Sequence, residues 1–296
     1  MDDTPVERMN LDDLIRCAKS SLRGALERKD GDAAARIVDA LPGTSFTHGL
    51  DLSGMKIDYV SLNLINLTGA HMSFADLSYS TLTNSIIPYV NLSNAKLIGT
   101  KLGGARIDGS NLAGADLRFA NLTGASLRYA NLTNAILREA TLRNTELQDA
   151  DLTGANLAST DLIFAGLVKA NLSGANLLGA DLTKAKLSSA NLTGANLSGA
   201  NLTSAKLDGV NLTDADLTGA NLTEVDLTDA MLSNANLTGA NLARATLPEG
   251  FITPGTRING VPWMGIPLRC RVVTSLRGIA LYPLEPADGR AGPTRR

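Results

Sequence analysis

The sequence predicts an all-β solenoid in which the chain coils around a narrow interior of leucine and alanine. Leu, or in four cases Ile or Met, stands at every fifth position from Leu52 to Leu247, which makes 40 positions without a slip. The residue two places before each of them is usually Ala, as in Ala120-Asn121-Leu122. Aromatic residues make up only 4% of the chain, as expected for a core built of Leu and Ala. A fixed period over two-thirds of a chain decides its architecture.

The period of five matches neither a helix nor a strand, whose periods are about 3.6 and 2.0 residues. A chain that turns a corner every five residues places one Leu and one Ala inside each side. The fifth residue is Gly at 15 of the 40 positions, which suits corners with positive φ. Four sides close a square of 20 residues, so we expect about ten stacked coils and a rod roughly 48 Å long. One column of core leucines would then be Leu112, Leu132, Leu152, Leu172, Leu192 and Leu212.

The repeated unit resembles the A(D/N)LXX motif of the pentapeptide repeat family. Ala195-Asn196-Leu197 and Ala215-Asp216-Leu217 fit this motif closely, and the resemblance covers about residues 50–250. The resemblance implies a right-handed quadrilateral β-helix. It says far less about activity, because one fold hosts many functions.

The segments on either side of the repeats have a different composition, so we expect three parts: 1–45, 46–250 and 251–296. Residues 10–41 predict two helices, with Asn10 capping the first and Asp32 capping the second. We expect these helices to cap the open first coil, with partner docking and a secretion signal as alternatives.

The C-terminal segment contains the only Trp, Trp263, and carries seven Arg against two acidic residues. Residues 268–272 alternate as a strand does. The segment is expected to cap the last coil or to pair with a second copy as a homodimer, and the end from Ala287 is expected to be a disordered tail.

Composition argues against several classes of function. The net charge of −2 gives no bulk electrostatic preference, and Cys17 and Cys270 lie in different segments, which favours a reducing compartment. No Sec-type signal and no membrane-spanning run is visible, so we expect a cytoplasmic protein, with delivery by a specialised secretion system left open. His48 and His71 are the only histidines, and the chain has no Cys/His metal spacing and no phosphate-binding loop. We therefore expect no enzyme activity, no metal and no cofactor.

Equivalent residues of successive coils should stack, so departures from the motif map the surface that carries information. One outward strip combines aromatic, arginine and aliphatic side chains, which are frequent in interfaces: Tyr59, Tyr79, Ile98, Arg118, Phe119 and Arg138. A second outward patch is apolar: Ile163, Phe164 and Val168. Residues 96–143 carry a net charge of +4, whereas residues 201–230 form an acidic patch of Asp208, Asp214, Asp216, Glu224, Asp226 and Asp229 against one Lys.

These observations favour a non-catalytic scaffold that binds a protein partner through the strip. The family resemblance implies an alternative, because some of its members bind DNA gyrase or topoisomerase IV by imitating duplex DNA and so give quinolone or toxin resistance. The basic middle of the chain argues against this alternative, since mimicry needs a long acidic face. A secreted bacterial effector acting in host cells is a third hypothesis. Direct nucleic-acid binding is not expected, because the arginines and aromatics form no continuous groove.

Overall fold

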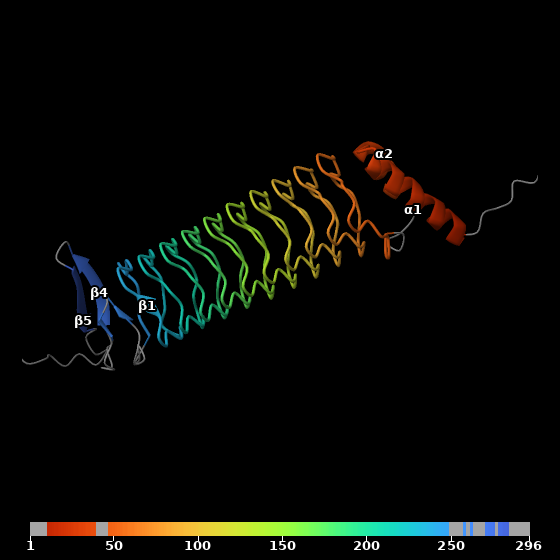
Figure 1. Cartoon of the computed structure of the whole chain (residues 1–296). Helices are drawn as coiled ribbons and strands as arrows, with labels where there is room; N and C mark the ends of the chain where they lie inside the picture. The colour runs from red at the N-terminus through yellow and green to blue at the C-terminus, as the bar shows by residue number, and fades with distance from the viewer. Residues whose placement is uncertain are drawn as a thin grey trace, which may run out of the picture.

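The repeats form a rod in which successive turns of the chain lie side by side (Figure 1). The computed structural model describes residues 11–39 and 47–248, together with short strands at 257–258, 261–262, 270–275 and 278–283. Parallel bridges join equivalent residues of adjacent turns, from Asp51 with His71 to Asp226 with Thr246. The predicted turn of four pentads is therefore the repeating unit of the structure.

One five-residue unit shows why the motif has its particular residues, because each of its five N–H groups has a partner. Ala120 donates to the Leu117 carbonyl (3.0 Å), which closes the preceding corner, and Asn121 donates to the Thr100 carbonyl of the previous turn (2.9 Å). Leu122 and Gly124 donate to carbonyls of the next turn, at 2.8 and 2.9 Å. The remaining N–H group, on Thr123, donates to the Asn121 side chain (3.0 Å). Asn or Asp is therefore favoured before each Leu because it satisfies the one donor that neighbouring turns leave unpaired.

The interior is filled by the leucine and alanine columns. All six leucines of the column from Leu112 to Leu212 are at most 1% exposed. Where Ser or Thr replaces Ala, the hydroxyl usually donates to a carbonyl of the previous turn, as Thr100 does to Leu77 (3.0 Å) and Thr145 does to Leu122 (2.8 Å). The core therefore accepts a small polar side chain when the hydrogen bond that it needs lies within reach.

Nearly every corner of the rod is a residue in the left-handed region, with φ between 55° and 70°. The prediction that glycine serves at corners is confirmed, but aromatic and charged residues adopt the same conformation, for example Tyr59, Phe119 and Glu139. This conformation is unfavourable for residues with a Cβ atom, and the hydrogen bonds on both sides hold it in place. Side chains at corners project outward, so a bulky corner residue is exposed by construction.

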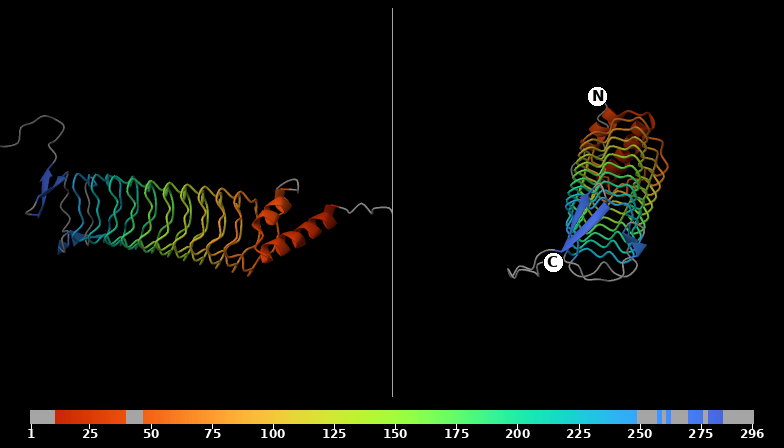
Figure 2. Two further views of the ribbon diagram at one scale, coloured as in Figure 1. Left: turned by 90° about the horizontal axis from the view of Figure 1, so that it is seen from above. Right: turned by 90° about the vertical axis from the view of Figure 1, so that its left-hand side faces the viewer.

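Two helices lie at the N-terminal end of the rod, α1 (Leu11–Glu27) and α2 (Gly31–Asp39) (Figure 2). The expected N-cap at Asp32 is wrong: the Asp30 carboxylate accepts the Ala33 N–H group at 2.9 Å, and Asp32 lies in the first turn of α2. Asp30 is the residue just before the helix, where a side chain can reach the free N–H groups. Asn10 lies outside the described residues.

The helices pack directly on the first turn of the repeats. Leu22 and Leu26 are fully buried in the same core as Leu52. The close approach needs Gly31, because a Cβ atom there would lie 1.7 Å from the Ser61 carbonyl oxygen. These contacts join the helices to the hydrophobic core of the first turn.

Short strands continue the chain at the other end of the rod. The strand β1 (Asn236–Leu237) pairs in parallel with β2 (Arg257–Ile258), which pairs antiparallel with β3 (Val261–Pro262). The strands β4 (Cys270–Ser275) and β5 (Gly278–Pro283) form an antiparallel pair. The strand expected at 268–272 thus starts at Cys270, and Trp263 and the tail from Ala287 lie outside the described residues. Within the described part of the chain, no helix has the length and apolar character needed to cross a membrane.

Candidate functional site

Four corners in each turn divide the rod into four sides. We name each side after one of its outward residues: the Asn131 side (130–134), the Arg118 side (115–119), the Asn121 side (120–124) and the Lys206 side (205–209), each with its equivalents in the other turns. The Arg118 and Lys206 sides are two corners apart and therefore face opposite directions.

The predicted strip runs along the Arg118 side near the N-terminal end. Backbone N–H groups of Tyr59, Tyr79 and Phe119 each donate to a carbonyl of the next turn, so the strip is one continuous ladder. The rings of Tyr59 and Tyr79 are stacked with centroids 5.1 Å apart and planes inclined by 18°. The Tyr79 ring extends over Gly99, where a Cβ atom would come within 2.7 Å of it. Glycine at this corner therefore gives the ring the space in which it lies.

Arg118 is the most firmly held polar side chain of the strip. Its Nε and Nη2 atoms donate to the two carboxylate oxygens of Asp116, at 2.8 and 2.7 Å. This hydrogen-bonded pair, and the charge of Asp116, raise the pKa of Arg118 above its ordinary value. The guanidinium remains exposed and charged, with its orientation fixed.

The other strip residues differ in how they are held. Phe119 is 56% exposed on its corner, and Ile98 is half-buried. Arg138 is exposed and contacts Glu139 at 3.0 Å. The structure thus places all six predicted residues on one side of the rod and brings Tyr59 and Tyr79 into contact.

The strip begins at the loop between α1 and α2, a contact that the sequence alone did not indicate. Lys29 donates to the Asp58 carboxylate at 2.8 Å and its ammonium lies 6.0 Å from the centre of the Tyr59 ring. The hydrogen bond from Lys29 lowers the pKa of Asp58, against the opposing effect of burial. No periodicity links Lys29 to Asp58, so only the fold reveals the pair.

The second predicted patch is divided by a corner. Ile163 and Phe164 lie on the Asn121 side, with Ile163 half-buried and Phe164 half exposed at the corner itself. Val168 lies beyond that corner on the Lys206 side and is half-buried. The Lys184 ammonium lies 5.5 Å from the centre of the Phe164 ring. The three residues therefore do not form one flat apolar surface.

The predicted acidic patch is also divided, because its residues belong to different sides. Asp214 lies on the Asn131 side and Asp216 on the Arg118 side. Asp216 is part of a ladder: burial alone would raise its pKa, but hydrogen bonds from Thr218 and Ser198 lower it. The other four carboxylates lie on the Lys206 side or on the corner where it begins: Asp208, Glu224, Asp226 and Asp229.

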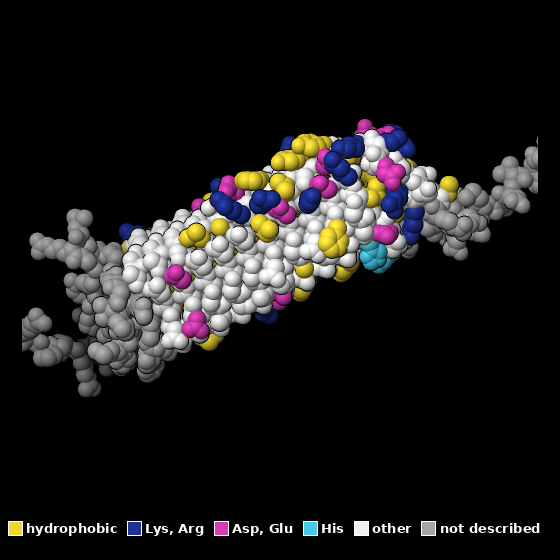
Figure 3. All heavy atoms as spheres, in the orientation of Figure 1, with side chains coloured by type: hydrophobic (Ala, Val, Ile, Leu, Met, Phe, Trp, Pro, Cys, Tyr) yellow, Lys and Arg dark blue, Asp and Glu magenta, His cyan; other side chains and the backbone are white. Residues whose placement is uncertain are grey.

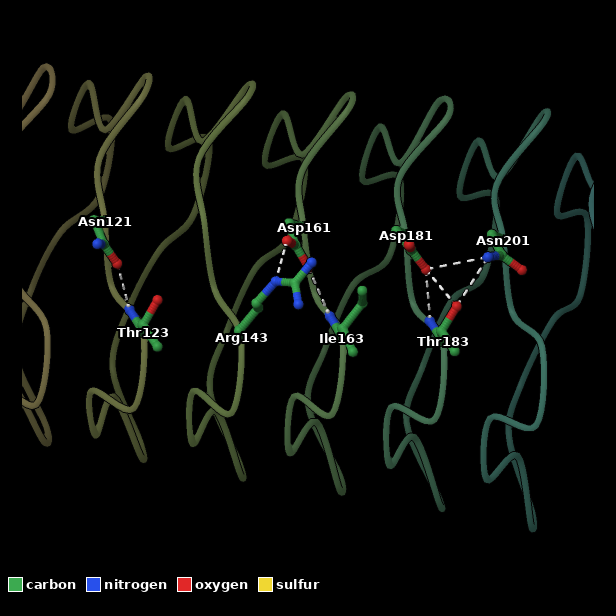
Figure 4. Close-up of polar contacts among 8 residues, drawn as sticks. All are labelled: Asn121, Thr123, Arg143, Asp161, Ile163, Asp181, Thr183 and Asn201. Atoms are coloured by element: carbon green, nitrogen blue, oxygen red, sulfur yellow. Dashed lines mark hydrogen bonds and ion pairs between the residues drawn. The ribbon is translucent and has the colours of Figure 1, made fainter.

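The excess positive charge of residues 96–143 is largely paired. Four of its arginines contact a carboxylate: Arg118, Arg128, Arg138 and Arg143. Arg143, for example, pairs with Asp161 across the Asn121 side (Figure 4). This segment is therefore less basic as a surface than its composition indicates.

Hydrogen bonds within the rod occupy most polar groups of the plain repeats. Asn201 donates to Asp181 (3.3 Å) and to the Thr183 hydroxyl (2.8 Å), and the Thr183 hydroxyl donates to Asp181 (Figure 4). On the face in Figure 3, charged and hydrophobic side chains gather toward the N-terminal half, whereas the C-terminal half is mostly uncharged. The plain repeats are thus used for stability, and the varied ones present chemistry to solvent.

Sequence reasoning missed several other bulky residues at corners. Four such side chains are exposed on the other sides of the rod: Leu64, Phe74, Tyr89 and Tyr129. The signal was available, because the pentad register marks each of them as a fifth residue. Tyr89 lies over Gly109 just as Tyr79 lies over Gly99.

The described residues offer little chemistry of the catalytic kind. No group of three or more His, Cys, Asp and Glu in the part that the structure describes could hold a metal ion. His71 is bridged to Asp51 and Asn91 in the neighbouring turns, as the register predicts.

Comparisons with known proteins find other pentapeptide repeat proteins. HetL, a pentapeptide repeat protein involved in heterocyst differentiation regulation from the cyanobacterium Nostoc sp. strain PCC 7120, is 34% identical over 68% of this chain and 93% of HetL, with a TM-score of 0.41. A variant of QnrB1, a plasmid-mediated fluoroquinolone resistance protein, is 19% identical over 73% of this chain and 90% of its own, with a TM-score of 0.43. A pentapeptide repeat protein from the Arabidopsis thaliana thylakoid lumen is 33% identical over 40% and 72%, with a TM-score of 0.25. No curated protein matches significantly.

The family model for pentapeptide repeats matches eight overlapping segments that together span residues 48–247. This span is most of the chain and includes every residue of the strip. The chain therefore belongs to the pentapeptide repeat family.

Proposed function

We propose that this protein is a non-catalytic scaffold that binds a protein partner through the Arg118 side of its N-terminal half. The observation that carries the proposal is the stacked pair of Tyr59 and Tyr79 in line with Phe119 and the fixed guanidinium of Arg118. Aromatic and arginine side chains are the residues on which interface energy most often depends.

Apart from the stacking of Tyr59 on Tyr79 and the contact of Lys29 with Tyr59, folding gives little reason for these aromatic side chains. A corner needs φ near +60°, which glycine adopts freely and a residue with a Cβ atom adopts only at a cost. Tyr59, Tyr79 and Phe119 are at least half exposed, so they contribute little to the core. A requirement outside the chain, such as a binding partner, accounts for their presence.

The surroundings favour tight binding because little has to be ordered. The Tyr79 ring is held between Tyr59 and Gly99, and Asp116 holds Arg118 in one orientation. Side chains that are already ordered lose less conformational entropy when a partner binds. Ile163 and Phe164 lie toward the far corner of the adjoining Asn121 side, so they are not part of this contact.

DNA mimicry receives less support from this geometry. It needs a continuous acidic face, but Asp214, Asp216 and Asp226 lie on three different sides. A secreted effector would use the same aromatic and arginine contact on a host protein. The surface therefore does not distinguish an effector from a scaffold in the cytoplasm, and the two hypotheses differ only in where the protein acts.

Several structural expectations are part of the proposal. We propose about ten coils of right-handed sense, with residues 1–45 capping the first coil and residues 251–296 forming a C-terminal cap or dimerisation element. We also propose that the protein acts in the cytoplasm and uses no cofactor.

The test is affinity capture with the full chain, comparing wild type with an Arg118→Glu/Phe119→Asn variant by mass spectrometry. Asn tolerates the left-handed corner, so the second change removes the ring and keeps the turn. The matched control is Arg128→Glu/Tyr129→Asn, because Arg128 and Tyr129 occupy the same two places of the unit on the opposite side of the rod.

The proposal expects a protein that wild type and the control retain and the Arg118 variant loses, with unchanged circular dichroism for all three. Equal loss in both variants, or retention by both, would overturn the assignment of the strip. Gyrase or topoisomerase IV subunits retained by the Arg118 variant would instead support DNA mimicry.

A further inference from the structure

The Lys206 side, together with the corner where it begins, carries an ordered arrangement of charge near the C-terminal end of the rod. Its basic residues come first along the axis, at Lys169, Lys184 and Lys186. Its acidic residues follow, at Glu224, Asp226 and Asp229, with Lys206 and Asp208 together in the middle turn. This side is independent of the strip proposed above, which faces the opposite direction.

Among the described residues, no acidic side chain forms an ion pair with the lysines of this side. Within the described ranges, no carboxylate lies within ion-pair distance of Lys184, Lys186 or Lys206. Lys186 and Lys206 are bridge partners in adjacent turns, so two like charges lie next to each other in one column. Adjacent like charges on a sheet destabilise it, and an external negative charge would remove that cost.

We propose that this side binds the same side of a second copy of the chain, with the two rods antiparallel. A two-fold axis that passes through the centre of the patch, perpendicular to the rods, reverses the order of turns. A surface that pairs with itself in this way must be self-complementary about the axis.

The corner column meets this condition about Ser204. One turn before Ser204 lies Lys184, and one turn after it lies Glu224, so each lysine faces the glutamate of the other copy. Two turns away, Phe164 corresponds to Arg244, whose guanidinium already contacts Glu224 at 2.8 Å. Arginine above an aromatic ring is a favourable contact, so the charged and aromatic positions of this column meet suitable partners.

The adjoining columns share the same centre. Lys186 and Asp226 lie one turn on either side of Lys206, so these two residues also face each other across the axis. Each Lys206 would face Lys206 of the other chain. Asp208 lies two residues away in the same turn, so Asp208 of the other chain supplies a carboxylate for each Lys206. A groove of about 490 Å³ beside Ser204 and Lys206 gives these side chains room to turn.

In the corner column that contains Gly209, Lys169 lies two turns toward the basic end and Asp229 one turn toward the acidic end, so this column follows the gradient of charge without the two residues facing each other. The patch spans four steps between turns, which is roughly 19 Å at ~4.8 Å per step. An interface of this length is small and polar, so the pair should be weak and sensitive to salt.

Sedimentation velocity over a concentration series tests the proposal on the full chain. One variant reverses the basic end, Lys184→Glu/Lys186→Glu, and a second reverses the acidic end, Glu224→Lys/Asp226→Lys. The control is Lys96→Glu/Lys101→Glu, because these lysines are exposed away from the patch and the change in net charge equals that of the first variant.

Wild type and control should dimerise at low ionic strength and dissociate at ~1 M salt, where the Debye length is only ~3 Å. Each reversed variant alone should dimerise at least about tenfold more weakly. An equimolar mixture of the two reversed variants should recover association, because positions 184, 186, 224 and 226 are then all acidic in one chain and all basic in the other.

Three outcomes would overturn the proposal: a wild type that stays monomeric at low ionic strength, a dimer that the reversals leave unchanged, or a mixture that fails to associate. The second outcome would assign dimerisation to another part of the chain, such as the C-terminal segment. Circular dichroism of each variant separates loss of association from loss of folding.

Discussion

Replacing Leu152 with Ala tests how tightly the interior of the rod is packed. Leu152 is fully buried and lies in the column between Leu132 and Leu172. The substitution removes three carbon atoms, which at ~0.8 kcal/mol each amounts to roughly 2.4 kcal/mol of lost burial. The cost rises further if the surrounding structure cannot close the space.

The structure indicates that the space stays open. The Leu152 N–H group donates to the Asn171 backbone carbonyl at 2.7 Å, and the Leu132 N–H group donates to the Asp151 backbone carbonyl at 2.6 Å. These hydrogen bonds hold neighbouring turns at a fixed spacing. The nearest small side chains are alanines, which cannot extend into the gap. We therefore expect a total loss of about 3–5 kcal/mol in the free energy of unfolding.

Urea unfolding followed by circular dichroism measures the loss, with Leu152→Met as the control of nearly equal volume, expected to cost less than about 1.5 kcal/mol. Hydrogen exchange adds the location, because contacts join only adjacent turns and the loss of protection should be greatest within residues 132–172. A loss below about 1 kcal/mol, or a uniform loss of protection along the rod, would refute the reasoning.

Three further predictions concern the N-terminal end. Lys29→Met should lower the thermal unfolding temperature, and the difference in unfolding temperature from wild type should narrow as the pH falls below about 3.8. Lys29 lowers the pKa of Asp58 in the folded state, so the stabilisation is present above the unfolded pKa of Asp58 and is lost in acid. A difference that stays constant with pH would contradict this prediction. Asp30→Ala should cost about 1 kcal/mol by removing the N-cap of α2, and unchanged helicity and stability would contradict that role. Gly99→Ala should lower the free energy of unfolding by more than about 1 kcal/mol, since φ is +61° and the new Cβ atom meets the Tyr79 ring. The loss should be smaller when Tyr79 is also replaced by Ala, and an equal loss in both backgrounds would disprove the contact.

The sequence predicts the rod well because its periodicity fixes two things at once. A Leu at every fifth position sets the corner spacing, and a turn of four such units then sets which residues are neighbours. The bridges of His71 with Asp51 and Asn91 follow from that arithmetic alone. The same arithmetic places Tyr79 beside Tyr59, and their stacking needs only a corner geometry that fifth residues share.

Contacts outside the register are the ones that the sequence does not predict. The pairing of Lys29 with Asp58 depends on how the helices dock, and no repeat relates the two segments. The sequence also does not distinguish Asp30 from Asp32 as the N-cap, because both are suitable residue types and only the position of the first turn decides between them. The acidic patch is continuous only along the sequence, because Asp214, Asp216 and Asp226 lie on three different sides of the rod.

The two proposed surfaces are compatible because of where they lie on the rod. The strip around Arg118 occupies the N-terminal half of one side, and the patch centred on Ser204 occupies the C-terminal half of the opposite side. Antiparallel pairing about Ser204 would leave both N-terminal halves free at the two ends of the pair. The two strips would then face outward in opposite directions, so the pair could bind two partner molecules at once. The second contact would raise the strength of binding only where those partner molecules are themselves linked.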